Sequence, residues 1–165
     1  NHKHVKVIKD GSRENVLSLW GDDGILNMGG YGTKVDSTPI PFNPKGKYRL
    51  SAWARSTGPD CRVLIEGWRW NPGIKPHPDP KIWEMRRFYK FSQIYWNKAE
   101  TGTMGGIGRG GAWKKATGDI FPGDNLSKMA KEKLAMVQFL VVHIIAIGGS
   151  EGELLVDDVC VEKIK

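Results

Sequence analysis

Short segments of alternating apolar and polar residues recur along the chain, and glycine, proline or asparagine residues separate them. A period of two is typical of a β-strand with one buried face, and frequent turns between short strands are typical of a β-sandwich. The predicted fold class is therefore all-β, a two-sheet antiparallel sandwich of the jelly-roll kind with one short helix. The segments expected to form strands are 4–9, 16–20, 35–42, 48–55, 62–70, 85–91, 93–96, 113–121, 136–147 and 154–164.

Two segments depart from this alternation. The pattern over 125–133 predicts a short helix, with Asn125 or Ser127 able to cap its first turn. The segment 136–147 is rich in β-branched residues and is expected to be a central strand buried on both faces. Three further segments are rich in glycine or proline and are predicted to be loops: 22–32, 71–80 and 101–111.

The alternation in two neighbouring strands also suggests a functional surface. Each strand has one apolar face for the core and one face with aromatic and charged residues. These residues are Trp53 and Arg55 in the strand at 48–55, and Glu66, Trp68 and Trp70 in the strand at 62–70. If both strands turn these faces the same way, one surface presents three indole rings among groups that can form hydrogen bonds.

The tryptophan content supports this interpretation. The chain has seven Trp residues, all before residue 114, which is more than a core of this size requires, so some are expected to be exposed for binding. Trp83 and Trp96 flank predicted loops, where they could line a cleft or anchor the Pro-rich loop.

Charge and cysteine content narrow the class of protein. The 25 Lys and Arg against 18 Asp and Glu give a net charge of +7, but the basic residues are dispersed, which favours a solvated surface over a nucleic-acid track. Cys61 and Cys160 are too few for a disulfide framework. They could pair with each other, but we expect two unpaired Cys, one of them in a core strand. The longest apolar run, 134–147, is too short for a bilayer-crossing helix of about 20 residues. We expect one domain over 1–165, without a visible signal peptide, excised from a larger protein.

Three stretches carry a family resemblance. Segment 40–56 contains the pattern Tyr-x-Leu-Ser-x-Trp-x-Arg after a Pro-containing turn, segment 113–118 reads Trp-Lys-x-x-Thr-Gly, and segment 152–162 closes with Asp157-Asp158-Val159 after an apolar strand. In order and spacing these resemble the jelly-roll carbohydrate-binding modules of the xylan- or glucan-binding, galactose-binding-like type, which accompany bacterial polysaccharide-degrading enzymes.

This resemblance implies a non-catalytic protein that binds a polysaccharide or oligosaccharide by stacking aromatic rings on sugars at a sheet face or loop rim. It also implies neighbouring domains in a parent protein, a secreted or cell-surface location, and a possible structural calcium ion at Asp157 or Asp158, although the usual N-terminal Glu-containing segment is missing. The candidate carbohydrate-binding residues are Trp53, Arg55, Glu66, Trp68, Trp70, Trp83 and Trp96.

Several alternatives stay open from the sequence. Trp53 is either a ligand platform or a residue packed between the sheets, whereas Trp68 and Trp70 are expected to be exposed. Glu66 could bind a sugar hydroxyl or form a salt bridge with Arg55 or Arg62. His143 is expected to be a hydrogen-bonded core residue.

The acidic pair and the function class have alternatives of their own. Asp157 and Asp158 are calcium ligands, buried hydrogen-bond acceptors or surface charges. A glycosidase would need two carboxylates across the scissile bond, and only Glu66 and Glu84 lie among the aromatic residues. A structural domain that packs beside a catalytic domain would instead explain exposed Trp as an interface.

Overall fold

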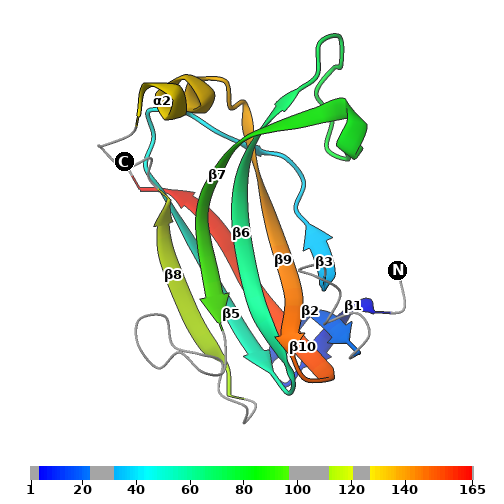
Figure 1. Ribbon diagram of the computed structural model, residues 1–165. Helices are drawn as coiled ribbons and strands as arrows, with labels where there is room; N and C mark the ends of the chain where they lie inside the picture. The colour runs from blue at the N-terminus through cyan, green and yellow to red at the C-terminus, as the bar shows by residue number, and fades with distance from the viewer. Residues whose placement is uncertain (1–3, 23–31, 97–111, 121–126, 165) are drawn as a thin grey trace.

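The computed structural model describes residues 4–22, 32–96, 112–120 and 127–164 and contains two antiparallel sheets that face each other (Figure 1). The first sheet has the strand order β1 (Val5–Asp10), β2 (Arg13–Gly21), β10 (Gly152–Lys163), β5 (Tyr48–Ser56) and β8 (Lys114–Ile120). The second has the order β3 (Thr33–Asp36), β9 (Phe139–Gly149), β6 (Pro59–Trp70) and β7 (Met85–Trp96), and β4 (Ile40–Pro41) also pairs with β9. The predicted sandwich is confirmed.

The core lies between the two sheets because each contributes its apolar alternate positions. On β5, Leu50, Ala52 and Ala54 are fully buried, and the intervening residues are only partly buried. The opposing layer is formed by β6 and β9, which pair along most of their lengths. Each fully buried aliphatic side chain contributes about 1.5–3 kcal/mol, so this alternation supplies most of the stabilisation. The core residues of the second sheet include Val63, Ile65, Leu140, Val142 and Ile144.

The predicted cysteine state is also confirmed. Cys61 and Cys160 are both free, and Cys61 lies in the core on β6. Burial, with Asp60 nearby, raises the pKa of the Cys61 thiol well above its usual range, so this side chain behaves as a small apolar residue.

Most predicted elements form, with shifted boundaries. The segments 85–91 and 93–96 join into the single strand β7, and the strand predicted from residue 136 begins at Phe139. The helix α2 runs over Lys128–Ala135, and Ser127 Oγ caps it by accepting from the backbone N–H of Ala130 at 3.2 Å. Asn125, the other predicted cap, lies outside the described residues. No helix in the described ranges is long and apolar enough to cross a bilayer.

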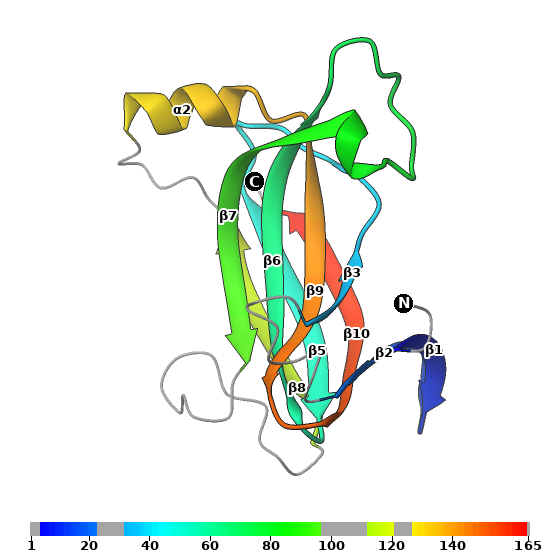
Figure 2. The same ribbon diagram turned by 45° about the vertical axis from the view of Figure 1, so that its right-hand side comes forward.

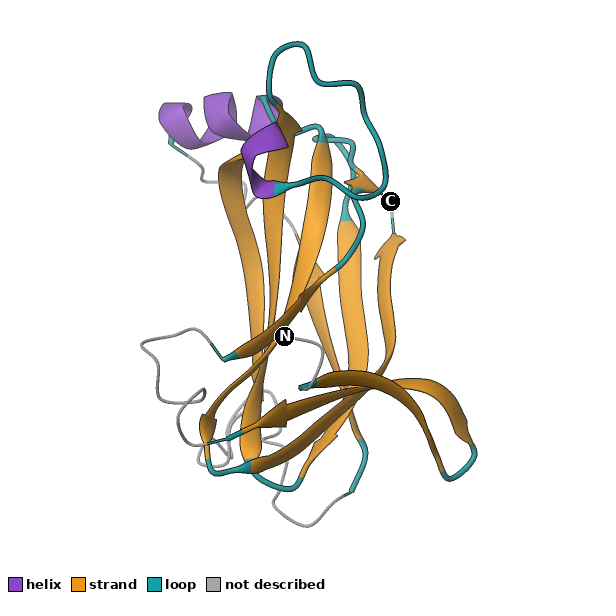
Figure 3. Ribbon diagram, turned by 90° about the vertical axis from the view of Figure 1, so that its right-hand side faces the viewer, coloured by secondary structure: helices purple, strands orange, loops and turns teal. Residues whose placement is uncertain are grey.

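One end of the sandwich carries the features that form the candidate site. The long connection from β6 to β7, which includes the short 3-10 helix η1 (Ile82–Glu84), and α2 lie at the same end of the sheets (Figures 1 and 2). At the other end, the β1–β2 hairpin extends away from the two layers (Figure 3). The hairpin tip curls toward β5 and β8, since Asp10 contacts Arg55 and Trp113.

Candidate functional site

The two strands expected to share one aromatic surface belong to different sheets. β5 pairs with β10 and β8 in the first sheet, whereas β6 pairs with β9 and β7 in the second. Trp53 and Arg55 therefore lie on one outer face of the sandwich, and Glu66 and Trp68 lie on the other. The predicted single surface is wrong.

The reason lies in the turn between the two strands, which crosses from one sheet to the other. A Cβ atom on Gly58 would lie 2.3 Å from the backbone oxygen of Glu151, so only glycine permits this close approach. Ser56 Oγ donates to the backbone oxygen of Pro59 at 2.5 Å and accepts from the N–H of Gly58 at 3.2 Å. Short alternating strands joined by a turn suggest a hairpin, and here the turn joins the two layers instead.

On the first sheet, Trp53 is covered by charged residues. The guanidinium carbon of Arg13 lies 4.9 Å from the Trp53 ring centroid and 4.6 Å from that of Trp113. Arg13 Nη1 donates to Asp157 Oδ2 at 2.6 Å, and Trp113 Nε1 donates to Asp10 Oδ2 at 2.9 Å. Trp53 is thus not packed between the sheets. One face of its ring is covered by Arg13 and is not available for stacking on a ligand.

The same contacts test the calcium site. The carboxylates of Asp157 and Asp158 already have a cationic partner, because Arg13 Nη1 lies 2.6 and 3.3 Å from one oxygen of each. Within the described ranges, no group of three or more His, Cys, Asp and Glu side chains could hold a metal ion. These residues do not fit a calcium ion, which takes six to eight oxygen ligands. Asp157 instead accepts from Arg13 and from the backbone N–H of Asp158 at 2.8 Å.

On the second sheet, Trp68 is buried, with 7% of its surface exposed, so its predicted exposure is wrong. It packs with Phe139, Val141, Trp70 and Met85 in a small hydrophobic cluster separate from the main core. Trp68 still points outward, as the alternation predicts, because β6 pairs with β9 in regular register from Cys61 to Trp68. The side chains of this cluster cover it there, so the outer face of β6 is buried along with the inner one at this end of the strand.

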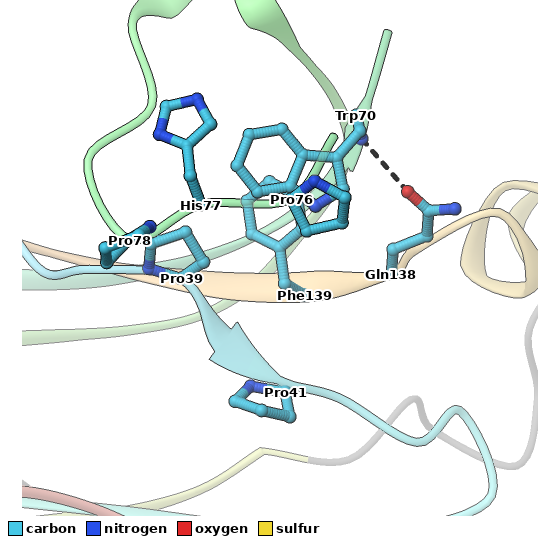
Figure 4. A pocket seen from close by; sticks show the side chains of 8 residues that line it. All are labelled: Pro39, Pro41, Trp70, Pro76, His77, Pro78, Gln138 and Phe139. Carbon is cyan, nitrogen blue, oxygen red and sulfur yellow. Dashed lines mark hydrogen bonds between the residues drawn. The ribbon is translucent and has the colours of Figure 1, made fainter. Parts of the chain in front are cut away.

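A cleft of about 560 Å³ opens beside this small cluster, between the β6–β7 loop and β9 (Figure 4). The ring centroids of Trp70 and Phe139 lie 4.9 Å apart, and those of Trp70 and His77 lie 5.2 Å apart. The volume falls within the roughly 300–1,000 Å³ of small-molecule sites. The cleft is lined by Pro39, Pro41, Trp70, Pro76, His77, Pro78, Gln138 and Phe139.

The loop that forms one wall of the cleft is held by its own side chains. Asn71 Nδ2 donates to the backbone oxygen of Trp83 at 2.7 Å, which closes the loop near its base. Glu84 Oε2 accepts from the backbone N–H of Lys81 at 2.7 Å and lies 3.2 Å from His77 Nε2. Proline restricts the backbone further, so the wall is ordered before any ligand arrives.

Next to Trp68, a row of charged side chains crosses β3, β9, β6 and β7 of the second sheet. His143 on β9 is buried and lies between Asp36 on β3, whose Oδ1 is 2.6 Å from Nδ1, and Glu66 on β6, whose Oε2 is 3.2 Å from Nε2. Arg87 on β7 donates to Glu66 Oε1 at 2.9 Å. His143 is hydrogen-bonded, as predicted, but it lies on the outer face rather than in the core between the sheets. Glu66 forms a salt bridge with Arg87, whereas Arg55, one of its two predicted partners, pairs with Asp10.

These contacts shift the pKa values of the row. Burial alone would lower the pKa of His143, but its contacts with Asp36 and Glu66 outweigh burial and raise it. Burial would raise the pKa values of Asp36 and Glu66, but His143, with Lys34 beside Asp36 and Arg87 beside Glu66, lowers both. Glu66 therefore stays ionised, whereas a glycosidase general acid needs a raised pKa.

Of the two remaining predicted residues, Trp83 does not line the cleft. Trp83, on η1, is 62% exposed, and the side chain of Trp96 lies outside the described part of the structure. Of the eight lining residues, only Trp70 was predicted to bind, and the missed ones include His77, Gln138 and Phe139. Gln138 is a polar break in an apolar run and His77 stands among prolines, and either irregularity could have marked these positions.

Comparison with known proteins agrees with this architecture. The chain is similar to a protein from Bacteroides thetaiotaomicron that is provisionally described as sugar binding, with a TM-score of 0.58 and 14% identity over 96% of this chain and 80% of that one. A structure described as CBM4 (TM-score 0.48, 13% identity, 96% and 77% of the two chains) and the CBM22-1 xylan-binding domain of Paenibacillus barcinonensis Xyn10C (TM-score 0.48, 9% identity, 98% and 80%) are more distant. No family model matches the chain, and no curated protein matches it. The chain has the jelly-roll fold of carbohydrate-binding modules, as its motifs predict.

Proposed function

We propose that this domain binds saccharides without chemical change, in the cleft between the β6–β7 loop and β9. The observation that carries the proposal is the partly exposed Trp70 in an apolar cleft of about 560 Å³ with polar groups at its edge. A pyranose has an apolar C–H face that packs on an indole ring and a rim of hydroxyls that need hydrogen-bond partners. Gln138 and His77 can supply those partners.

The ordered β6–β7 loop favours a rigid, preformed binding site over a flexible one. Four prolines and the Asn71 and Glu84 hydrogen bonds restrict the loop in the free protein, so little conformational entropy remains to be lost on binding. A saccharide is a weakly apolar ligand with many hydroxyls, and a preformed site is the means by which such a ligand gains affinity.

The test is calorimetric titration of the domain with cellohexaose, xylohexaose and mannohexaose, compared with the Trp70→Ala variant. We expect at least one oligosaccharide to bind and Trp70→Ala to weaken it about tenfold, equivalent to about 1.4 kcal/mol. Trp70→Phe keeps the packing against Phe139 and should give an intermediate affinity. Met129→Ala is the matched control, since Met129 is exposed on α2 at the same end of the molecule and does not line the cleft.

Absence of binding to all three oligosaccharides, or unchanged affinity in a folded Trp70→Ala variant, would contradict the proposal. Loss of binding in Trp83→Ala alone would move the site from the cleft to the exposed surface of η1. Circular dichroism of each variant separates loss of binding from loss of fold.

A second candidate, contact with a neighbouring domain, is favoured by one observation. Ile82 and Trp83 are adjacent on η1 and are 68% and 62% exposed, which is unusual for large apolar side chains. Concentration-dependent self-association of the isolated domain that disappears in an Ile82→Ser, Trp83→Ser variant would support it. An accessory role beside a polysaccharide-degrading catalytic domain, outside the cell, belongs to the same proposal.

A further inference from the structure

The outer face of the first sheet carries a second hollow, of about 300 Å³, that the proposed cleft does not include. It is lined by His4, Lys6, Ser18, Trp20 and Glu153. These residues lie on β1, β2 and β10 of the first sheet, or directly before β1, whereas the cleft lies against the second sheet. The two hollows therefore share no residue and no strand.

Strand pairing explains why these side chains converge. Trp20 is the direct partner of Glu153 on β10, and its backbone N–H donates to the oxygen of His4 at 2.8 Å. Lys6 and Ser18 are partners in the adjacent row. Paired residues in antiparallel strands point to the same face, so five side chains from three segments meet on one pleated surface. Sites on strands are held more rigidly than sites on loops.

The chemistry of the hollow combines an accessible indole with oriented polar groups. Trp20 is 42% exposed, more than the other Trp side chains that the structure describes except Trp83. Ser18, which is buried, donates from Oγ to Glu153 Oε1 at 2.6 Å and so fixes the carboxylate. Nδ1 of His4 is buried and has no hydrogen-bond partner among the residues that the structure describes, so a ligand group that reached it would relieve the cost of leaving this atom unpaired.

The charges of the hollow indicate which ligands it can accept. Lys6 would repel a cation and Glu153 would repel an anion. A compact charged ligand would therefore be attracted by one of these side chains and repelled by the other. A neutral polyol has no such conflict: its hydroxyls donate to the carboxylate and accept from the ammonium group, while its C–H face packs on Trp20. The volume suits a single sugar ring rather than a long chain.

We infer that this hollow, named here the Trp20 site, is a second saccharide-binding site that takes one sugar ring, such as the end of a glycan chain. It acts independently of the cleft. With sites on the outer faces of two opposed sheets, one domain would hold two separate glycan chains and could cross-link them.

The test uses the indole N–H signals in a two-dimensional ¹H–¹⁵N spectrum, of which seven are expected from seven Trp residues. Trp20→Phe and Trp70→Phe variants assign the two signals of interest. Glucose, xylose, mannose and galactose, and the three hexaoses used for the cleft, are the ligands. We expect the Trp20 signal to shift on titration with at least one of them, to shift equally in Trp70→Ala, and to respond about tenfold more weakly in Glu153→Ala.

The outcomes distinguish this inference from the proposed cleft. A Trp20 signal that no saccharide moves overturns the Trp20 site, whatever the Trp70 signal does. A Trp20 shift that vanishes in a folded Trp70→Ala variant also overturns it, because the two sites would not be independent. A shift of Trp20 alone supports the Trp20 site and contradicts the cleft. Glu162→Ala is the matched control, since Glu162 is exposed near the other end of β10 and should leave the response unchanged.

Discussion

Arg13 lies between two indole rings and next to two carboxylates, although the alternation pattern leaves it between the predicted strands 4–9 and 16–20. A guanidinium over an aromatic ring contributes about 0.5–1 kcal/mol at exposed sites and more where water is excluded. Asp157, whose side chain is 14% exposed, would lose its main partner without it. Together with Asp10, which accepts from Arg55 and Trp113, this side chain joins the β1–β2 hairpin to the outer face of the first sheet.

We predict that Arg13→Met lowers the free energy of unfolding by about 1–2 kcal/mol, because the ring contacts weaken and Asp157 loses its ion pair. Lys9→Met on the same hairpin is the control. Lys9 and Glu14 form an exposed pair, with both side chains about two-thirds exposed, and such pairs contribute little. Urea unfolding measures both variants, and an equal effect of the two would contradict the role assigned to Arg13.

The shifted pKa of His143 makes the free energy of unfolding depend on pH. Its raised pKa means that its contribution is fully present below the unfolded value of about 6.5 and is lost as pH rises through the folded pKa. Asp36 and Glu66 have lowered pKa values, so their contribution is present above about pH 4 and is lost as pH falls through the folded values. The row of charges should be most stabilising between these limits.

We expect the free energy of unfolding of the wild-type protein to decrease between about pH 6 and pH 9 more steeply than that of His143→Gln, which has no titrating group at this position. Denaturant titrations across this range measure the two slopes. His77→Gln is the control, because His77 is more exposed and contacts only Glu84 among charged side chains in the described part of the chain. Parallel slopes for wild type and His143→Gln would show that the row does not titrate as described.

At the scale of elements, the β6–β7 loop controls the cleft. The Asn71 hydrogen bond to Trp83 closes the loop, yet both residues are at the surface, so this bond contributes more to the loop than to global stability. We predict that Asn71→Ala weakens oligosaccharide binding about three- to tenfold while leaving the melting temperature within about 2 °C. Calorimetry and thermal unfolding measure the two effects.

Asn43→Ala is the matched control for the loop. Asn43 Oδ1 accepts from the backbone N–H of Lys45 in a different turn, and Asn43 does not line the cleft. If both variants bind equally well, the loop does not need its Asn71 closure.

The strands themselves were predictable because local alternation reflects one buried face, as β5 shows over its full length. The failures have physical causes that the local pattern does not contain. The Gly58 turn sends β6 to the other sheet, and the packing of Phe139 and Val141 of β9 against Trp68 buries a position that simple alternation leaves exposed. Trp70 was identified from the sequence, whereas Phe139 was not, because an aromatic residue at the start of an apolar strand looks like core.

At the scale of the whole molecule, the outer faces of the two sheets carry different functional groups. The second sheet carries the apolar cleft and the charged row, and the first carries the Arg13 contacts and the Trp20 site. The fold fixes this division, since strand order determines which side chains can meet. Single-residue variants on one face should therefore leave the other face's binding unchanged, as sites without shared partners act additively.

The last prediction concerns metal ions, and it follows from the position of Arg13 on the closing acidic pair. A cation stabilises a protein only if it binds the folded state more tightly than the unfolded state. Because the Arg13 guanidinium already pairs with both Asp157 and Asp158, calcium would have to compete with it for these carboxylates. We expect the melting temperature in excess EDTA and in excess calcium chloride to agree within about 1 °C. A clear rise of the melting temperature with calcium would mean that the ion binds elsewhere or that it displaces Arg13. A rise seen only in Arg13→Met would identify Arg13 as the residue that replaces the ion.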